Sequence, residues 1–427
     1  MMNTQPIKAI IVGGGHRSLT YAALAEQEPA LLQIVGVADP DPGRRQMIAQ
    51  RFSIPDEHCY ETAEILAKAP KFADVVINGT MDHIHVETAV PLLRAGYDML
   101  LEKPFAVNEA QARLLVETAK ACGRRVMTCF VLRYAPFYKK IKELILSGAV
   151  GEILSIQTNE YVSYHHMSTS HVRGKWRNSE QCHSSMLLAK CCHDIDLMMW
   201  LMAGTEPKLV SSFGCNQQFR PDHAPQNAGT RCLVDCLLVD TCLYSAKRLY
   251  LDHPDRWTWY VWDALEHLQN PTLEDKKKLL KTSPYGVCAY KSDNNVVDHQ
   301  TVSVFFASGA TGVHCMIGGA STGKRTIHIT GTKGEIDGEC EAGRLTLSEI
   351  DPSPGCEHRD TVFDVQVKND SHGGGDLDLM RDFLACVRGE TPSVSCTDIQ
   401  DSLAGHLVVF LADRSMENGG APQPVIL

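Results

Sequence analysis

Short apolar runs alternate with amphipathic stretches along the first 130 residues. The runs have the character of buried parallel strands, and they lie at Lys8–Val12, Gln33–Ala38, Asp74–Asn78, Tyr97–Leu101 and Arg125–Phe130. The stretches between them have the pattern of helices, and they lie at Leu19–Ala25, Gly43–Arg51, Val86–Ala95 and Glu109–Ala121. Strands that alternate with helices of this length predict a parallel sheet with helices on both faces. We therefore expect an α/β domain over residues 1–130.

The pattern changes beyond about residue 150, where the strand-like segments are typical of an antiparallel sheet. These segments are Glu152–Tyr164, Lys208–Phe213, Thr301–Phe306, Gly312–Met316 and Thr326–Thr330. Ser308-Gly309 sits where a hairpin turn would join two of them. Helices are predicted at Ser184–Met202, Leu377–Arg388 and Ile399–Met416. We expect residues 131–427 to form an α+β domain with a large, mostly antiparallel open sheet and an irregular insertion at about residues 216–295.

Composition and charge exclude several classes of protein. The 427 residues are 44% hydrophobic and 22% charged, as in an ordinary globular protein. No apolar run reaches the roughly 18 residues of a membrane span, and the chain start lacks a signal-peptide pattern. The net charge is −10, and the Lys-rich run Lys276–Lys281 fits an exposed helix face. Sixteen cysteines without an export signal favour reduced thiols. We expect a cytoplasmic protein that acts on a small molecule and binds neither nucleic acid nor membrane.

A glycine-rich turn follows the first predicted strand. Gly13-Gly14-Gly15-His16-Arg17-Ser18 places a G-x-G-x-x-S motif between a strand and a helix, where the backbone can approach a pyrophosphate closely. Asp39 ends the second strand 26 residues after Gly13, and its carboxylate can bind the ribose 2′-hydroxyl of NAD. The alternative is an ordinary βα turn. Arg44 and Arg45 leave NADP open, because an Arg can accommodate a 2′-phosphate.

Lys103 closes the fourth predicted strand in the motif Glu102-Lys103-Pro104. In an open α/β sheet the carboxyl ends of the strands line the ligand site, so Lys103 is predicted to point at cofactor or substrate. Thr80, at the end of the preceding strand, is expected at the same edge. The alternative for Lys103 is a surface pair with Glu102.

Several short motifs follow one another along nearly the whole chain. They are Gly13-x-Gly15, Asp39, Thr80 with His85, Glu102-Lys103-Pro104, Arg133-Tyr134-x-Pro136, Gly148-x-x-Gly151, Gly331-Thr332-Lys333-Gly334 and His372-Gly373-Gly374-Gly375-Asp376. Their order and spacing resemble the glucose–fructose oxidoreductase/inositol dehydrogenase (Gfo/Idh/MocA) family. The resemblance implies an NAD-binding Rossmann domain, a sugar or cyclitol substrate, and a homodimer or homotetramer formed through the open face of the second sheet.

The resemblance also implies a catalytic set, in which the Lys of the Glu-Lys-Pro motif acts with a helix carrying D-x-x-x-H-x-x-D. Lys103 and His193 match this set, and His193 is the expected general base. Ala189 replaces the first Asp, while Asp196 retains the second. Lys190, beside Ala189, can reach His193 or pair with Asp194.

We expect two groups of binding residues. The cofactor-binding group consists of Gly13, Gly15, His16, Arg17, Asp39, Arg44, Thr80, His85, Glu102, Lys103 and Arg133. The substrate-binding group consists of His166, Arg173, Trp176, Lys190, Asp196, His299 and His372. A loop with Arg, Lys and Trp suits sugar hydroxyls and a sugar ring, although a surface loop with a half-buried Trp is the alternative. Four aromatic residues of the insertion lie close together, three of them with strand-like alternation: Trp257, Trp259, Tyr260 and Trp262. We expect them in core packing or an oligomer contact, with carbohydrate stacking as the alternative.

Cys232, Cys236 and Cys242 form a C-x₃-C-x₅-C pattern within the insertion. Three soft ligands where the core is thin suggest a structural zinc, with a fourth ligand from Cys215, Cys288 or a His. Coincidental clustering is the alternative, because the chain has many cysteines.

Three functions remain open. The first is an NAD-dependent oxidoreductase that acts on a hydroxyl of a sugar, glycoside or cyclitol. The second is a glycoside hydrolase in which NAD oxidises the sugar transiently, elimination expels the aglycone and the hydride is returned. The third is a non-catalytic NAD- or sugar-sensing regulator, against which the retention of Lys103 and His193 argues. No paired carboxylates of an ordinary glycosidase stand out in the sequence.

Overall fold

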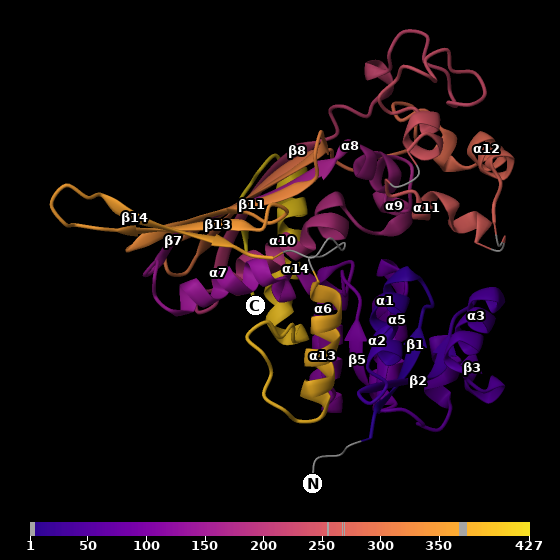
Figure 1. Ribbon diagram of the computed structural model, residues 1–427, viewed down its shortest axis with the longest axis horizontal. Helices are drawn as coiled ribbons and strands as arrows, with labels where there is room; N and C mark the ends of the chain where they lie inside the picture. The colour runs from indigo at the N-terminus through magenta and orange to yellow at the C-terminus, as the bar shows by residue number, and fades with distance from the viewer. Residues whose placement is uncertain (1–4, 254–255, 267, 269, 367–373) are drawn as a thin grey trace.

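Two sheets organise the chain. The computed structural model describes residues 5–253, 256–266, 268, 270–366 and 374–427. A six-stranded parallel sheet lies in the first part of the chain and a nine-stranded, mostly antiparallel sheet in the second. In Figure 1 the second sheet extends to the left, away from the helix-covered first domain, and the insertion lies at the upper right. The predicted fold class, a Rossmann domain followed by an α+β domain, is confirmed.

The first sheet has the strand order β3-β2-β1-β4-β5-β6, and every pairing in it is parallel. The strands are β1 (Ile7–Val12), β2 (Leu32–Ala38), β3 (Cys59–Tyr60), β4 (Val75–Asn78), β5 (Asp98–Leu101) and β6 (Val126–Thr128). The order reverses between β1 and β4, so the carboxyl ends of these two strands flank the ligand-binding crevice of a doubly wound fold. All four residues of β4 are buried, as a parallel strand covered on both faces requires.

Helices cover both faces of the first sheet. They are α1 (His16–Ala22), α2 (Leu24–Gln27), α3 (Pro42–Phe52), α4 (Ala63–Lys68), α5 (His85–Arg94) and α6 (Glu109–Cys122). Their boundaries follow from capping. Asp41 accepts hydrogen bonds from the N–H groups of Gly43 and Arg44 at the start of α3. Asn108 caps α6, which ends at Gly123 with φ +60°.

The second sheet has the order β14-β13-β12-β11-β7-β10-β9-β8-β15, and β7 and β10 form its parallel pair. Its strands are β7 (Ile153–Ser163), β8 (Pro207–Cys215), β9 (His299–Phe306), β10 (Thr311–Ala320), β11 (Lys324–Gly331), β12 (Gly334–Glu339), β13 (Arg344–Ile350), β14 (His358–Asp364) and β15 (Gln423–Pro424). The hairpin turn between β9 and β10 falls at Gly309, with φ +90°. Strands β12 to β15 were not predicted, and β14 is an almost wholly exposed edge strand without an apolar pattern.

The helices in the second part of the chain pack partly on one face of this sheet and partly against the first domain. They are α7 (Pro136–Leu146), α8 (Tyr164–His166), α9 (Ser179–Cys182), α10 (Cys192–Leu201), α13 (Gly375–Val387) and α14 (Ile399–Glu417). The helix predicted at Ser184–Met202 begins with a wide π-helical turn at Leu187–Cys191. Phe383 and Leu384 of α13 lie in the same core as Ile7 and Val37, so the C-terminal part completes the first domain (Figure 1).

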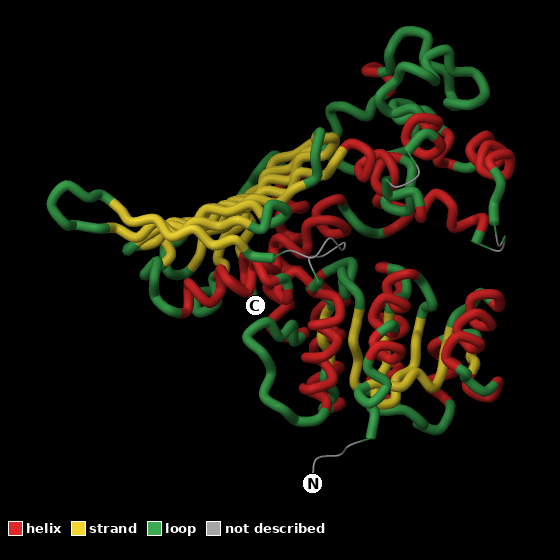
Figure 2. Tube along the Cα trace, in the orientation of Figure 1, coloured by secondary structure: helices red, strands yellow, loops and turns green. Residues whose placement is uncertain are grey.

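The insertion consists mainly of loops and short helices, as Figure 2 shows. Its longest described helix is α12 (Leu273–Thr282), in which Lys278 and Lys281 are exposed and Lys276 and Lys277 are partly buried. Leu249, Tyr250 and Leu280 form a small core of its own. The strand-like reading of the tryptophan segment is wrong, because Trp259–Trp262 forms the short helix α11.

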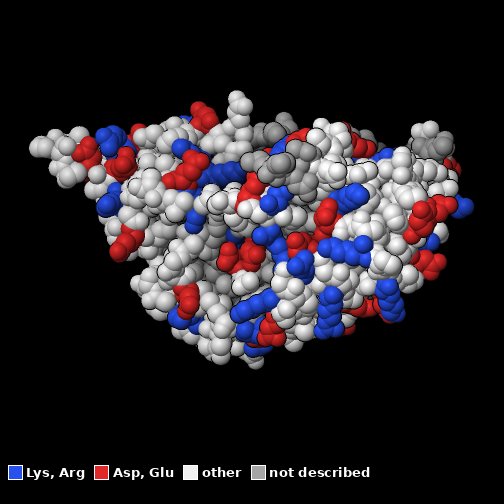
Figure 3. Space-filling model, turned by 90° about the horizontal axis from the view of Figure 1, so that it is seen from below, with Lys and Arg blue, Asp and Glu red and all other residues white. Residues whose placement is uncertain are grey.

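Charged side chains of both signs are mixed on the face of the molecule that Figure 3 shows. Figure 3 shows Lys and Arg interspersed with Asp and Glu on the face seen from below. Among the described residues, no helix combines the length and the apolar character needed to cross a membrane.

A buried ion pair joins the two domains. Arg133 follows β6, and its Nε and Nη2 atoms donate to the two carboxylate oxygens of Asp196 in α10, at 2.7 and 2.5 Å. Both side chains are almost completely buried, at 3% and 1% exposure. Arg133 Nη1 also donates to the backbone oxygen of Cys396 at 2.9 Å. Arg133 and Asp196 thus satisfy each other in this structure. The expected roles of Arg133 in cofactor binding and of Asp196 in substrate binding stay predictions.

Replacing one partner of this pair tests how much the pair contributes to the free energy of unfolding. Arg133→Met leaves the Asp196 carboxylate buried and unpaired, so we expect a loss of about 3–5 kcal/mol in unfolding free energy. Urea unfolding followed by circular dichroism measures it, with Glu64→Gln, which breaks the exposed Glu64–Lys68 pair, as the control. Equal transitions for Arg133→Met and the control would contradict the argument.

Candidate active site

The glycine turn after β1 is built for a close backbone approach. Gly13 has φ +77°, and a Cβ there would lie 2.8 Å from the backbone nitrogen of Thr80. At Gly15, which precedes α1, a Cβ would meet no heavy atom within 4 Å. Asp39 accepts the N–H of Gly14 at 2.6 Å and that of Asp41 at 2.8 Å. The turn is therefore tight against the sheet at Gly13 and open at Gly15, which suits a dinucleotide pyrophosphate.

Glu102 ties this turn to the Lys103 loop. Its Oε1 accepts from Arg17 Nε and from the Tyr21 hydroxyl, both at 2.8 Å, and its Oε2 accepts the N–H of Lys103 at 2.8 Å. Arg17 also pairs with Asp376 at 2.5 Å. Burial opposes the charged form of Glu102, but Arg17 and Lys103 outweigh it and lower its pKa. Arg17 and Glu102 are thus held by each other and shape the cofactor side of the site.

His85 is a buried support. Its Nδ1 lies 2.7 Å from the oxygen of Pro104, and its Nε2 lies 3.0 Å from the oxygen of Thr80. The residue is fully buried, so the structure assigns it to holding two loops together rather than to direct cofactor contact. Thr80 itself is partly exposed at the end of β4, beside Asn78.

Lys103 reaches from the first domain to the helix of the second. Its Nζ donates to the backbone oxygen of Ala189 at 3.0 Å. Burial opposes the ammonium, but the surrounding Cys192, Glu102 and Asp82 outweigh it, and the pKa of Lys103 is raised. His193 lies one helical turn beyond Ala189, is 4% exposed, and meets the edge of Phe130 at 5.7 Å. The structure thus brings together the segments that carry Lys103 and His193.

Lys190 belongs to a buried charge network. Its Nζ lies 2.6 Å from Glu160 of β7, whereas Asp194 pairs with Arg325 of β11 at 2.9 Å. Arg325 also lies 2.9 Å from Glu160. Lys190 therefore pairs with Glu160, and Asp194 pairs with Arg325, so the alternative of a Lys190–Asp194 pair is not what the structure shows. The expected role of Lys190 in substrate binding stays a prediction.

Two histidines and an insertion tryptophan form an aromatic group near Lys103. The rings of His166 and Trp257 stack at 3.6 Å with an interplanar angle of 7°. Burial, then Lys190 and His171, lower the pKa of His166 well below its usual value. Burial, then Lys190 and Lys103, lower the pKa of His171 to about 3. The Nδ1 of His171 is buried, and no described residue hydrogen-bonds to it.

Trp176 and Tyr260 continue this aromatic group toward the first domain. Trp176 Nε1 donates to Asp82 Oδ2 at 2.9 Å, and its ring meets the edge of Tyr260 at 5.9 Å. Burial raises the pKa of Tyr260, while Lys103 and Arg17 act to lower it, so the phenol lies within electrostatic reach of both. The aromatic residues of the insertion were expected in core packing or an oligomer contact, and not beside Lys103. Their clustering was the available signal, but nothing in the sequence indicated their distance from Lys103.

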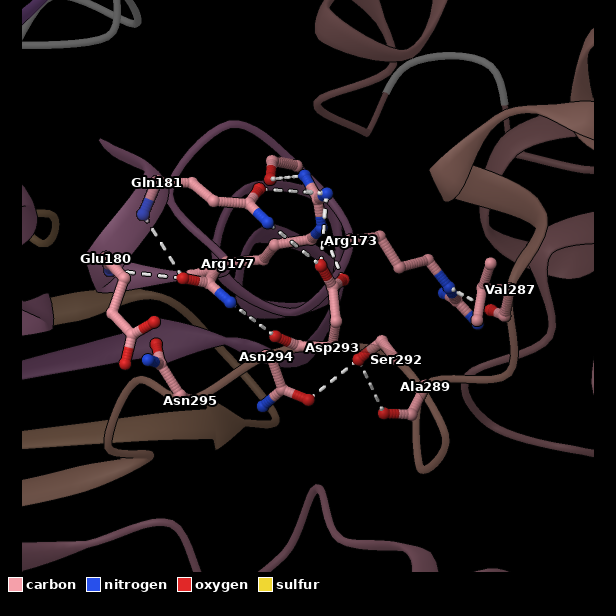
Figure 4. Close-up of polar contacts among 12 residues, drawn as sticks. Arg173, Arg177, Glu180, Gln181, Val287, Ala289, Ser292, Asp293, Asn294 and Asn295 are labelled. Carbon is pink, nitrogen blue, oxygen red and sulfur yellow. Dashed lines mark hydrogen bonds and ion pairs between the residues drawn. The ribbon is translucent and has the colours of Figure 1, made fainter. Parts of the chain in front are cut away.

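Three other predicted substrate residues do not join this group. Arg173 is 1% exposed, and its guanidinium donates to the backbone oxygen of Val287 at 2.7 Å (Figure 4). It also donates to the backbone oxygen of Tyr244 at 2.6 Å, so it anchors the insertion. His299 lies on the outer face of β9 and contacts Asp298 at 2.7 Å, whereas the next residue faces the helices. His372 lies outside the described residues.

The cysteine pattern does not form a metal site. Cys232, Cys236 and Cys242 line one small cavity together with Cys288, and all sixteen cysteines are free. In the described part of the chain, the groups of three possible ligand atoms within 4.8 Å of one another are Cys191, Asp194 and His314, and Asp382, Cys386 and Cys396. Tetrahedral zinc holds its sulfurs at about 2.3 Å, so the predicted three do not converge closely enough. The zinc prediction is not supported.

The parallel sheet, the glycine turn and Asp39 at the end of β2 define a dinucleotide-binding protein with a second, α+β domain. The model of the family described as "Oxidoreductase family, NAD-binding Rossmann fold" matches residues 7–130. The model described as "Oxidoreductase family, C-terminal alpha/beta domain" matches residues 142–425. The chain belongs to the Gfo/Idh/MocA oxidoreductase family, which confirms the resemblance seen in the sequence.

Similar proteins agree with this class. The oxidoreductase YteT of Bacillus subtilis (strain 168) is 26% identical over 386 residues, covering 86% of this chain and 85% of that protein. Inositol 2-dehydrogenase of Salmonella typhimurium is 24% identical over 197 residues, covering 46% of this chain and 54% of that enzyme. The solved structure of levoglucosan dehydrogenase with NADH aligns with a TM-score of 0.70 at 19% identity, over 99% of this chain and 100% of that one.

The environment of His171 leads to a prediction about its charge. Because its pKa is lowered to about 3, its imidazole is neutral throughout the range in which exposed histidines titrate. In ¹⁵N-histidine NMR its ring resonances, assigned by their loss in His171→Asn, should stay constant between about pH 5 and 8, where exposed histidines titrate. A titration midpoint inside that range would contradict the described environment.

Proposed function

We propose that the protein is an NAD-dependent oxidoreductase acting on a hydroxyl of a sugar, glycoside or cyclitol. The observation that carries the proposal is the contact of Lys103 Nζ with the helix turn that leads to His193. It joins the end of β5, where a doubly wound sheet presents its ligands, to the helix of the second domain. The printed names of levoglucosan dehydrogenase and inositol 2-dehydrogenase support this substrate class.

The glycine turn and Asp39 fit NAD. Gly15 leaves room beside the start of α1 for the pyrophosphate, and the carboxylate of Asp39 would accept the ribose hydroxyls. When bound, the nicotinamide ring takes up a hydride from the substrate carbon.

Lys103 and His193 have different roles, one as a hydrogen-bond donor to the substrate oxygen and the other as the general base. The Lys103 ammonium, whose pKa is raised, donates a hydrogen bond to the substrate oxygen and stabilises the charge that develops there. His193 accepts the hydroxyl proton as the general base. The carbonyl of Ala189, which accepts from Lys103 Nζ, keeps the ammonium aimed at the junction between the domains.

The aromatic group supplies the wall of the substrate site. Trp257, His166, Trp176 and Tyr260 offer flat faces suited to the apolar face of a sugar ring. His171, neutral and with an unsatisfied Nδ1, would accept a hydrogen bond from a substrate hydroxyl.

A second candidate function is glycoside hydrolysis through transient oxidation. Ala189 stands where the family pattern carries an Asp, so Lys103 contacts a backbone carbonyl there instead of a carboxylate. This departure from the dehydrogenase pattern favours a redox-neutral variant of the same chemistry. We do not propose a non-catalytic sensor, because both expected catalytic side chains are retained.

Incubation of the purified protein and NAD⁺ with a panel of sugars, cyclitols and glycosides separates the candidates. Net NADH, followed by its absorbance, is the result expected for the oxidoreductase. Free sugar without net NADH would favour the hydrolase, and neither product from any compound would contradict both proposals.

Replacement of the acid–base pair tests the residue roles. Lys103→Met should retain NADH binding and lose about 10²-fold or more in kcat, because it removes the donor to the substrate oxygen. His193→Ala should lose a similar amount, and the double variant should lose little more, since the two residues act as one relay. Full activity of either single variant would require another acid or base.

We also propose that copies associate through the outer face of the second sheet, as a homodimer or homotetramer. Leu209 and Phe305 lie opposite each other on β8 and β9 and are 43% and 46% exposed on this face. Phe305→Glu should shift the mass measured by light scattering from an oligomer toward a monomer. A monomeric parent protein would contradict the proposal.

A further inference from the structure

The insertion reaches the corner of the first domain where the cofactor's adenosine ribose is expected. Arg44 lies in α3, five residues after Asp39, and its Nε and Nη2 atoms both donate to Glu266 Oε1, at 3.1 and 3.0 Å. Arg45 Nη1 donates to the backbone oxygen of Asp39 at 2.5 Å. Both arginines that the sequence offered for a 2′-phosphate therefore already have partners.

Other contacts hold this part of the insertion in place. The rings of Trp259 and His16, the first residue of α1, lie stacked at 6.5 Å with an interplanar angle of 18°. Asp263 pairs with Lys175 of the second domain at 3.0 Å. Figure 1 shows α11 on the side of the molecule that faces α1 and α5. Glu266 thus approaches Arg44 as part of a segment with contacts to both domains.

The charge at this corner is unfavourable to a phosphate. A free Arg just after the second strand is what accommodates the 2′-phosphate of NADP, whereas the 2′-hydroxyl of NAD needs a carboxylate acceptor. Here the carboxylate of Glu266 compensates the guanidinium of Arg44, and Asp39 adds a second negative charge. A 2′-phosphate would have to displace Glu266 to reach Arg44, and it would then lie near two carboxylates.

We propose that Glu266, carried by the insertion, is a specificity-determining residue that disfavours NADP by engaging Arg44. The proposal rests on the assignment of the glycine turn and Asp39 to the dinucleotide, not on the choice of substrate. The choice between NAD and NADP then depends on a residue more than 200 positions away from the Rossmann motif, which usually determines this choice.

Fluorescence titration with NADH and NADPH tests the proposal without any turnover. Glu266→Gln keeps the size of the side chain but frees the Arg44 guanidinium, so NADPH should bind about fivefold more tightly, the scale of one exposed ion pair. The affinity for NADH should change less than about twofold, because its ribose hydroxyl does not use Arg44. Glu274→Gln, the same change on the exposed start of α12, should alter neither affinity.

The variant Arg44→Gln completes the test. In that background Glu266→Gln should no longer strengthen NADPH binding, since no guanidinium remains to receive the phosphate. The proposal is overturned if Glu266→Gln leaves NADPH affinity unchanged, or if it strengthens NADH and NADPH equally. A protein that binds neither dinucleotide would overturn the cofactor assignment as well, whereas inactive protein that binds NADH would count only against the proposed reaction.

Discussion

The buried ion pair of Arg133 and Asp196 is the constraint on which the arrangement of the site depends. Arg133 lies in the short helical turn Val131–Tyr134 after the last strand of the parallel sheet, and Asp196 lies one turn after His193 in α10. Neither charge has access to water, so separating the domains at this point would leave a buried charge unpaired. The pair therefore fixes α10 against the first domain, where Lys103 can reach the turn that begins at Ala189.

The sequence predicted the parallel sheet well, because strands buried on both faces are continuous apolar runs. It missed β3, which is two residues long, and β14, which is exposed along an edge. Lys103 was predictable from its place after a strand. The partner of Lys190 was not, because helical spacing reveals neighbours on the same helix and not Glu160 on a strand packed behind it. For the same reason the sequence could not indicate the buried protein partners of Arg173, His85 and Asp196.

The insertion was the part that sequence reasoning described least. Its aromatic residues and Glu266 contact His16, His166 and Arg44, which lie far away in the sequence and on both domains. Such contacts depend on the fold of a segment with little regular structure, and no periodic pattern of apolar residues predicts them. The family fold thus places the cofactor and Lys103, while the insertion brings the groups that would select the dinucleotide and face the substrate.

A crystal structure of the protein with NADH tests the central claim, that the reaction centre forms where Lys103 meets the His193 helix. We expect the adenosine ribose on Asp39 and the nicotinamide C4 within about 5 Å of both Lys103 Nζ and the His193 ring, leaving room for one substrate hydroxyl between them. A nicotinamide that points away from Lys103 would contradict this expectation. So would a His193 ring that points into the core and not toward the nicotinamide C4.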